Sequence, residues 1–111
     1  MNGRLALVER AIARYNDRDA EGYAAFFTDG GSEGMYRGDV LRAGRDAVRT
    51  GNGKTFADFP ENRAEILAGH ELGDHVVLHE KVWRTAAGEP FEVVSIYSFS
   101  DDLIDRVEFV R

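Results

Sequence analysis

The chain contains no cysteine, two prolines and one tryptophan among its 111 residues. Without cysteine it forms neither disulfide bonds nor thiolate metal sites. It also lacks a run of about 20 apolar residues, the length that a membrane-spanning helix needs. Residues 1–4 show none of the apolar stretch of a signal peptide. From these absences we expect a cytoplasmic protein that does not enter a membrane.

The charge balance is acidic, with 20 Asp and Glu against 14 Lys and Arg and a formal net charge of −6. Such a surface repels phosphate backbones, so nucleic acid is not an expected partner. The length is close to the commonest size of one domain. No repeat, linker or low-complexity segment divides the chain, so we treat residues 1–111 as a single domain with one core.

The first half of the chain shows helical patterns interrupted by polar breaks. Apolar side chains recur every three or four positions over the first segment, which predicts an amphipathic helix. A second, short helix should end at the glycines 30 and 31, and Pro60 should close a third. The elements predicted before residue 62 are helices at 3–16, 19–27 and 44–60, a short strand at 32–37 and a loop at 38–43.

From residue 62 onward the hydrophobic period changes to two, which is typical of strands. Helices followed by an antiparallel meander indicate an α+β fold with the helices on one face of the sheet. Both faces of the last three strands are half apolar, so we expect the helices to cover one face and a second copy of the chain the other. The strands are predicted at 62–71, 74–84, 90–99 and 103–110. The face expected to meet the second copy carries Val76, Leu78, Val82, Val94, Ile96 and Val110.

This order of elements resembles the nuclear transport factor 2-like superfamily. That group includes SnoaL-like polyketide cyclases, ketosteroid isomerases and limonene-epoxide hydrolases. Four short motifs carry the resemblance, which spans nearly the whole chain: YNDRD at 15–19, FFTD at 26–29, GRDAV at 44–48 and SFSDDLI at 98–104. It implies a cone-shaped, cystatin-like fold in which three N-terminal helices pack on a curved antiparallel sheet around one blind pocket.

The catalytic residues of these relatives are not preserved in this chain. Ketosteroid isomerases use a tyrosine, a carboxylate base and a protonated aspartate, and those positions fall here on Ala11, near Met35 and near Ser95. Limonene-epoxide hydrolases carry an arginine and an aspartate where this chain has Lys81 and Trp83. Neither activity therefore transfers directly, and it stays open whether the chain is an enzyme.

His79 is the leading candidate for acid–base chemistry, because neutral imidazole takes and gives protons near pH 7. Lys81 shares its face, about 7 Å further along the strand. If the hairpins are centred on Gly88 and on residue 101, His79 faces Tyr97 and Tyr97 faces Asp105. Such a row across three strands would pass a proton. The alternative is a solvated strand end or a dimer contact.

The resemblance further implies that the face with His79 points into the pocket, where aromatic and hydroxyl side chains would bind a small apolar molecule. The plainer interpretation is that the aromatic side chains only fill the core. No metal or other cofactor is expected, because His75 and His79 would lie about 13 Å apart on a strand. The expected ligand-binding residues are Tyr15, Phe27, Tyr36, Trp83, Ser95, Phe99 and Phe109.

Two hypotheses about function follow from these patterns. The first is a cofactor-free isomerase, cyclase or hydrolase that acts on an apolar, oxygenated compound by acid–base chemistry. The second is a non-catalytic ligand-binding or dimerisation module with a vestigial pocket. The polar residues of the pocket-facing set favour the first hypothesis, whereas the loss of the relatives' catalytic residues favours the second.

Overall fold

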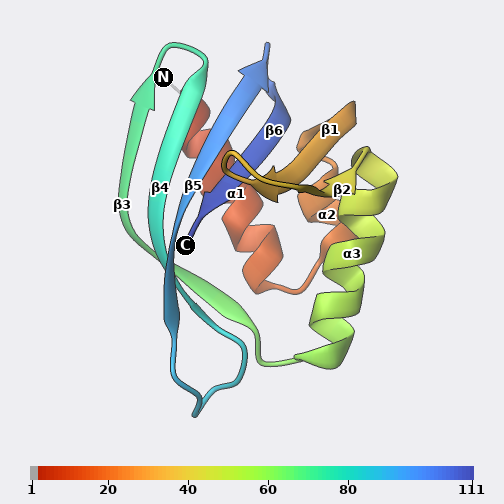
Figure 1. Ribbon diagram of the computed structural model, residues 1–111, viewed down its shortest axis with the longest axis vertical. Coiled ribbons are helices and arrows are strands. Elements are labelled where there is room, and N and C mark those ends of the chain that lie inside the picture. Colours follow the sequence, from red (N-terminus) through yellow and green to blue (C-terminus); the bar gives the residue numbers. More distant parts are fainter. Residues whose placement is uncertain (1–2) are drawn as a thin grey trace.

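The computed structural model describes residues 3–111, in which three helices pack against a curved six-stranded sheet (Figure 1). The apolar repeat of the first segment forms α1, and the alternating segments after residue 62 form the last four strands, as predicted. The helices are α1 (Arg4–Asn16), α2 (Ala20–Ala24) and α3 (Arg45–Asp58). The strands are β1 (Phe27–Met35), β2 (Val40–Ala43), β3 (Arg63–Leu72), β4 (His75–Trp83), β5 (Phe91–Ser100) and β6 (Leu103–Val110).

Residues 25–43 differ from the prediction. The second helix ends at Ala24, glycines 30 and 31 lie inside β1, and the predicted loop at 38–43 contains β2. Pairing with β2 on one side and β6 on the other overrides the weak strand propensity of this glycine-rich segment. A Cβ atom at Gly31 would lie 3.0 Å from the Ile104 carbonyl oxygen, so glycine allows the close approach of β1 to β6.

The sheet has the strand order β2-β1-β6-β5-β4-β3. β1 runs parallel to β6, and the other neighbouring strands are antiparallel. The predicted purely antiparallel sheet is therefore corrected. The short strand predicted at 32–37, between the second and third helices, is part of β1, and β2 follows it before α3. A parallel pair needs a long crossover, and here the rest of the chain supplies it.

The third helix continues through its two glycines, although each costs about 1 kcal/mol relative to alanine. Asn52, between them, is buried. Its side-chain amide donates to the Val48 carbonyl oxygen at 2.8 Å and to the Glu33 carboxylate at 3.0 Å. Tertiary contacts thus hold a segment whose own helix propensity is weak.

The register between β4 and β5 also differs from the prediction. Tyr97 pairs with Val76, and His79 pairs with Val94. The turn closes through the Gly88 amide, which donates to the Thr85 carbonyl oxygen at 3.3 Å, so the hairpin is centred before Gly88. An odd shift of register exchanges the two faces of a strand.

This exchange decides which side chains of β4 face the helices. Val76, Leu78 and Val82 are buried beneath the helices, so assigning them to the partner face was wrong. Val94, Ile96 and Val110 do lie on the outer face, where Val94 and Ile96 are half-buried and Val110 is exposed. Among residues 3–111, none of the helices has the length and apolar character needed to cross a membrane.

Candidate functional site

A cavity of about 160 Å³ opens between the concave face of the sheet and the helices. Its apolar wall includes Ile12 from α1 and residues of the last strands such as Val82, Val93 and Phe109. Polar side chains enter it from all three helices and from β1, β2, β4 and β5. A concave apolar site with a few convergent polar groups is the usual form of a small-molecule site.

Glu80 is the acid of β4 that faces this cavity. It occupies one of the inward positions of the strand, between Leu78 and Val82, and is 4% exposed. The Ser95 hydroxyl donates to its carboxylate at 2.8 Å. Burial raises the pKa of the Glu80 carboxyl, and the hydrogen bond from Ser95 opposes this only in part. Such a carboxyl group is suited to take up and release a proton.

Tyr97 lines the cavity from the same inward face of β5 as Ser95. It is 1% exposed. Burial, followed by the charges of Glu80 and Glu33, raises the pKa of the Tyr97 phenol well above its ordinary value. The hydroxyl therefore stays protonated, so it can donate a hydrogen bond to a ligand oxygen.

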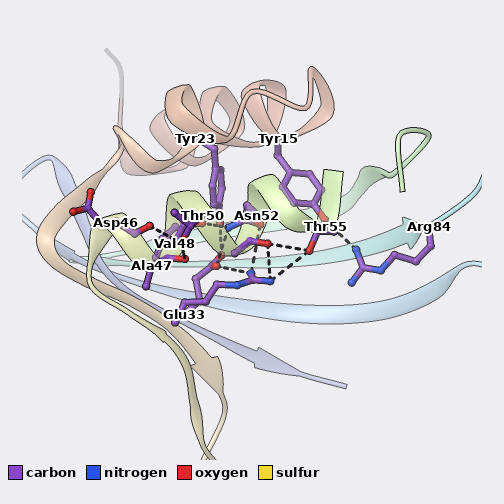
Figure 2. Close-up of polar contacts among 12 residues, drawn as sticks. Tyr15, Tyr23, Glu33, Asp46, Ala47, Val48, Thr50, Asn52, Thr55 and Arg84 are labelled. Atoms are coloured by element: carbon purple, nitrogen blue, oxygen red, sulfur yellow. Dashed lines mark hydrogen bonds and ion pairs between the residues drawn. The ribbon is translucent and has the colours of Figure 1, made fainter. Parts of the chain in front are cut away.

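Glu33 is the second buried carboxylate of the cavity, and it has a different environment (Figure 2). Tyr23 of α2 donates to it at 2.8 Å, Arg42 of β2 at 2.8 Å and Asn52 of α3 at 3.0 Å. Burial and then the Glu33 charge raise the pKa of the Tyr23 phenol well above its ordinary value. Because its partners come from three elements, Glu33 ties β1 to the wall of the cavity.

Arg84 lies just past the end of β4 and also lines the cavity. Its guanidinium donates to the Asn62 side-chain oxygen at 2.6 Å and to the Tyr15 hydroxyl at 3.4 Å. Figure 2 shows Tyr15 pointing from α1 toward Arg84. The Arg84 guanidinium also lies 5.1 Å from the centre of the Phe91 ring, and that of Arg111 lies 4.0 Å from it.

The structure brings together some of the predicted site residues. Those that line the cavity are Tyr15, Ser95, Tyr97 and Phe109. Phe27 and Phe99 are buried in the core but do not line the cavity, as the plainer interpretation of the aromatic residues expected. Tyr36 is 49% exposed and lies outside the cavity.

The predicted proton relay is wrong, because its three residues do not share a face. His79 lies on the outer face, where its Nε2 is 2.6 Å from a Glu92 carboxylate oxygen. Tyr97 pairs with Val107 on β6. Asp105 is exposed beside the register shift of that pair and accepts a hydrogen bond from Thr28 at 3.3 Å.

The other two predicted site residues on β4, Lys81 and Trp83, also lie on the outer face. They occupy the same alternating set as His79, away from the cavity. The Arg63 guanidinium packs over the Trp83 ring, 3.9 Å from the ring centre. As for metal ligands, no group of three or more His, Asp or Glu side chains within residues 3–111 is arranged to hold an ion.

Sequence reasoning missed several polar residues of the cavity: Tyr23, Glu33, Arg42, Asn52, Glu80, Arg84 and Arg111. One signal was present, since Glu80 is the single acid in an otherwise apolar alternating set with Val76, Leu78 and Val82. An acid in such a set either faces solvent or is buried at a site, and the register of the strand decides which face of the sheet it lies on. Glu33 and Asn52 had no comparable signal, because their contacts join distant segments.

Comparisons with known proteins agree with this architecture. An uncharacterized cystatin-fold protein from Novosphingobium aromaticivorans is 39% identical, with a TM-score of 0.94 and 100% of both chains covered. An NTF2-like protein of unknown function from Cytophaga hutchinsonii is 14% identical, with a TM-score of 0.81 over 99% of this chain and 90% of that one. A protein with a ketosteroid isomerase-like fold from Catenulispora acidiphila is 17% identical, with a TM-score of 0.76 over 94% and 83%.

No curated protein matches the sequence significantly. The profile of the SnoaL-like domain matches residues 8–107, which is most of the chain. The resemblance to the nuclear transport factor 2-like superfamily is thus confirmed by both sequence and fold. The chain belongs to the SnoaL-like domain family.

Proposed function

We propose that the cavity binds a small, mostly apolar molecule that contains an oxygen atom, and that Glu80 exchanges a proton with it. The family favours a small-molecule ligand. The observation that carries the proposal is the Glu80 carboxyl group, which is buried in the cavity with Ser95 as its hydrogen-bond partner. A carboxyl group with a raised pKa in an apolar site is a recurring form of general acid or base.

The chemistry that suits this pair of groups is proton transfer next to a carbonyl. The Glu80 carboxylate would take a proton from the carbon beside the carbonyl, and the carbonyl oxygen would become an enolate oxygen. The protonated Tyr97 hydroxyl, on the same wall, would donate a hydrogen bond to that oxygen as charge develops. If the ligand has a double bond between its β and γ carbons, the anion is a dienolate. Return of the proton from Glu80 to the γ carbon then moves the double bond next to the carbonyl and completes an isomerisation, with no oxidant or reductant required.

Glu33 has a different part in this proposal. Its carboxylate already accepts hydrogen bonds from three side chains, one of them the cationic Arg42. Both oxygen atoms of this carboxylate are engaged within the protein, Oε2 by Tyr23 and Oε1 by Arg42 and Asn52. We therefore assign Glu33 to shaping the cavity wall and Glu80 to proton exchange.

Binding without catalysis is the second candidate function. Its support is that most of the polar lining is already engaged within the protein, as the Glu33 cluster and the contacts of Arg84 show. Such groups hold the shape of a pocket without reacting. The two candidates agree on the cavity and differ on whether Glu80 moves a proton.

Ligand binding is tested with 2-naphthol, an apolar molecule with one hydroxyl group, by titration calorimetry. We expect saturable one-to-one binding to the wild-type protein. Val93→Phe should weaken it at least tenfold, because Val93 lines the cavity and the larger ring fills it. Val40→Phe is the matched control, since Val40 is exposed on β2 and does not line the cavity. Equal effects of the two variants, or no binding, would refute the proposed site.

Proton exchange is tested with the same probe by fluorescence at about pH 8, above the ordinary range of carboxyl groups. Excited 2-naphthol is a strong acid and emits as naphtholate when a base accepts its proton. We expect naphtholate emission from the probe bound to the wild-type protein and neutral emission from the probe bound to Glu80→Gln. Neutral emission from both, with unchanged affinity, would favour binding without catalysis.

We also propose that two copies of the chain associate through the outer face of the sheet. That face carries the half-buried apolar side chains of Val77, Trp83, Val94 and Ile96, and apolar residues grouped on one face often mark an interface. Its charges are of both signs, such as Lys81 beside Glu92. A two-fold interface requires this kind of self-complementary surface.

A further inference from the structure

The charges that line the cavity do not balance. Three arginines, Arg42, Arg84 and Arg111, line it together with two glutamates. Arg42 is paired with Glu33 at 2.8 Å. Across residues 3–111, no salt bridge joins Glu80 to an arginine. The cavity therefore has an excess of positive charge in a chain whose formal net charge is −6.

Two of the three arginines, Arg84 and Arg111, have no part in the ion pair with Glu33. Of these two, Arg84 has its side chain held in place by hydrogen bonds. It is half-buried, and its polar contacts are with two neutral side chains. Asn62 accepts from it at 2.6 Å and is itself 0% exposed. The Asn62 amide nitrogen is buried without a hydrogen-bond partner. A flipped amide would place this nitrogen against the guanidinium, so Arg84 sets the orientation of Asn62 and leaves one donor unsatisfied.

This arrangement holds a cation at the cavity without neutralising it. Tyr15 and Asn62 direct the Arg84 guanidinium, and the Phe91 ring lies beside it. The Arg111 guanidinium lies 4.0 Å from the centre of the same ring, so both arginines contact one aromatic side chain. A planar guanidinium binds a carboxylate through two parallel hydrogen bonds, and it does so more strongly where water is excluded.

We propose that the ligand of this cavity carries a carboxylate group, which Arg84 binds with Arg111 beside it. The apolar body of the ligand would lie against Phe91 and Val93, and its far end would reach Glu80 and Tyr97. This inference rests on the proposed function and narrows it to an apolar or aromatic carboxylic acid. It excludes uncharged compounds as the preferred ligands of the site.

The test compares two probes of similar shape, 2-naphthoate and the uncharged ketone 2-acetonaphthone, by titration calorimetry at low salt. We expect the wild-type protein to bind 2-naphthoate at least tenfold more tightly than the ketone. Added salt should reduce this preference, because it screens the charge interaction. Arg84→Gln should abolish the preference by weakening 2-naphthoate alone, whereas Arg84→Lys should retain part of it.

Arg10→Gln is the control for loss of one positive charge, because Arg10 is exposed on α1 and does not line the cavity. The inference is overturned if the wild-type protein binds both probes equally, or if Arg84→Gln weakens both by the same factor. In those cases the ketone still binds and the proposed site stands. Failure of both probes to bind overturns the proposed site and this inference together. If Arg84→Gln does not fold, the wild-type comparison, its salt dependence and Arg84→Lys decide.

Discussion

The Ser95 hydroxyl donates a hydrogen bond of 2.8 Å to the Glu80 carboxylate across the neighbouring strands β5 and β4. Both residues are buried. The other buried carboxylate, Glu33, accepts from a tyrosine, an arginine and an asparagine. Two carboxyl groups thus line one cavity in opposite electrostatic settings, and removing their charges should have opposite effects on stability.

Glu80→Gln should raise the free energy of unfolding at neutral pH by roughly 0.5–2 kcal/mol, which is the usual range for a single stabilising substitution. The amide keeps the size of the side chain and a hydrogen-bond partner for Ser95, and it removes the cost of burying a charge. Urea denaturation followed by circular dichroism measures the change. A loss of stability in Glu80→Gln would contradict the idea that the buried Glu80 charge destabilises the fold.

Glu33→Gln should instead lower the free energy of unfolding by roughly 2–3 kcal/mol. Breaking a fully buried ion pair costs about 3–5 kcal/mol, and the effect is smaller here because the Arg42 side chain is 27% exposed. Glu80→Gln is the matched control, because it makes the same substitution at the other buried glutamate of the cavity. Changes of the same sign in both variants would show that the two carboxyl groups do not lie in opposite electrostatic settings.

The stability of the wild-type protein should fall relative to Glu80→Gln as pH rises from about 4.5. Burial raises the pKa of Glu80 in the folded protein above its ordinary value of 4.5, so the folded state binds the proton more tightly than the unfolded state. The resulting stabilisation is present below that value and is lost as pH rises through the raised pKa. The difference between the two unfolding curves measures it, because the other carboxyl groups cancel. A flat difference would contradict the prediction.

Phe27→Ala should destabilise the protein by about 3–5 kcal/mol, as expected when a buried ring leaves a cavity in a core. Phe27 is 0% exposed at the start of β1, and its ring lies 5.3 Å from that of Tyr23. The neighbouring Phe26 is only half-buried, so Phe26→Ala should cost about 1–2 kcal/mol. Thermal and urea unfolding of both variants check the order. Losses below about 1 kcal/mol in both would refute this packing.

Sedimentation at micromolar concentration should show a species of twice the 12.4 kDa chain mass. Ile96→Arg should shift it toward the monomer, because a charge would then lie at the centre of the proposed interface. Ala57→Arg adds the same charge on the exposed side of α3 and should leave the dimer intact. A wild-type protein that sediments only as a monomer would rule out the interface.

The sequence by itself was sufficient for the α1 helix, the third helix, the four long strands and the family. The first helix and the strands depend on local periodicity and turn residues, which any short window of the chain contains. The third helix also depends on the tertiary contact of Asn52 with Glu33. The aromatic core was also foreseen in part, since Phe27, Tyr97 and Phe99 are buried. The alternation of β5 places Tyr97 on the same face as Ser95, and the resemblance implied that this face points into the pocket. Both residues do line the cavity.

Only the tertiary structure decided which acid faces the cavity. The position of the turn between β4 and β5 sets the register, and an odd shift turned His79 outward and Glu80 inward. The Glu33 cluster and the contact of Arg84 with Asn62 join segments far apart in the chain. Local sequence patterns carry no information on such contacts, because they depend on how the sheet curves around the helices. The chemistry of the cavity was therefore determined by pairing between strands, and the framework that holds it by the sequence of each element.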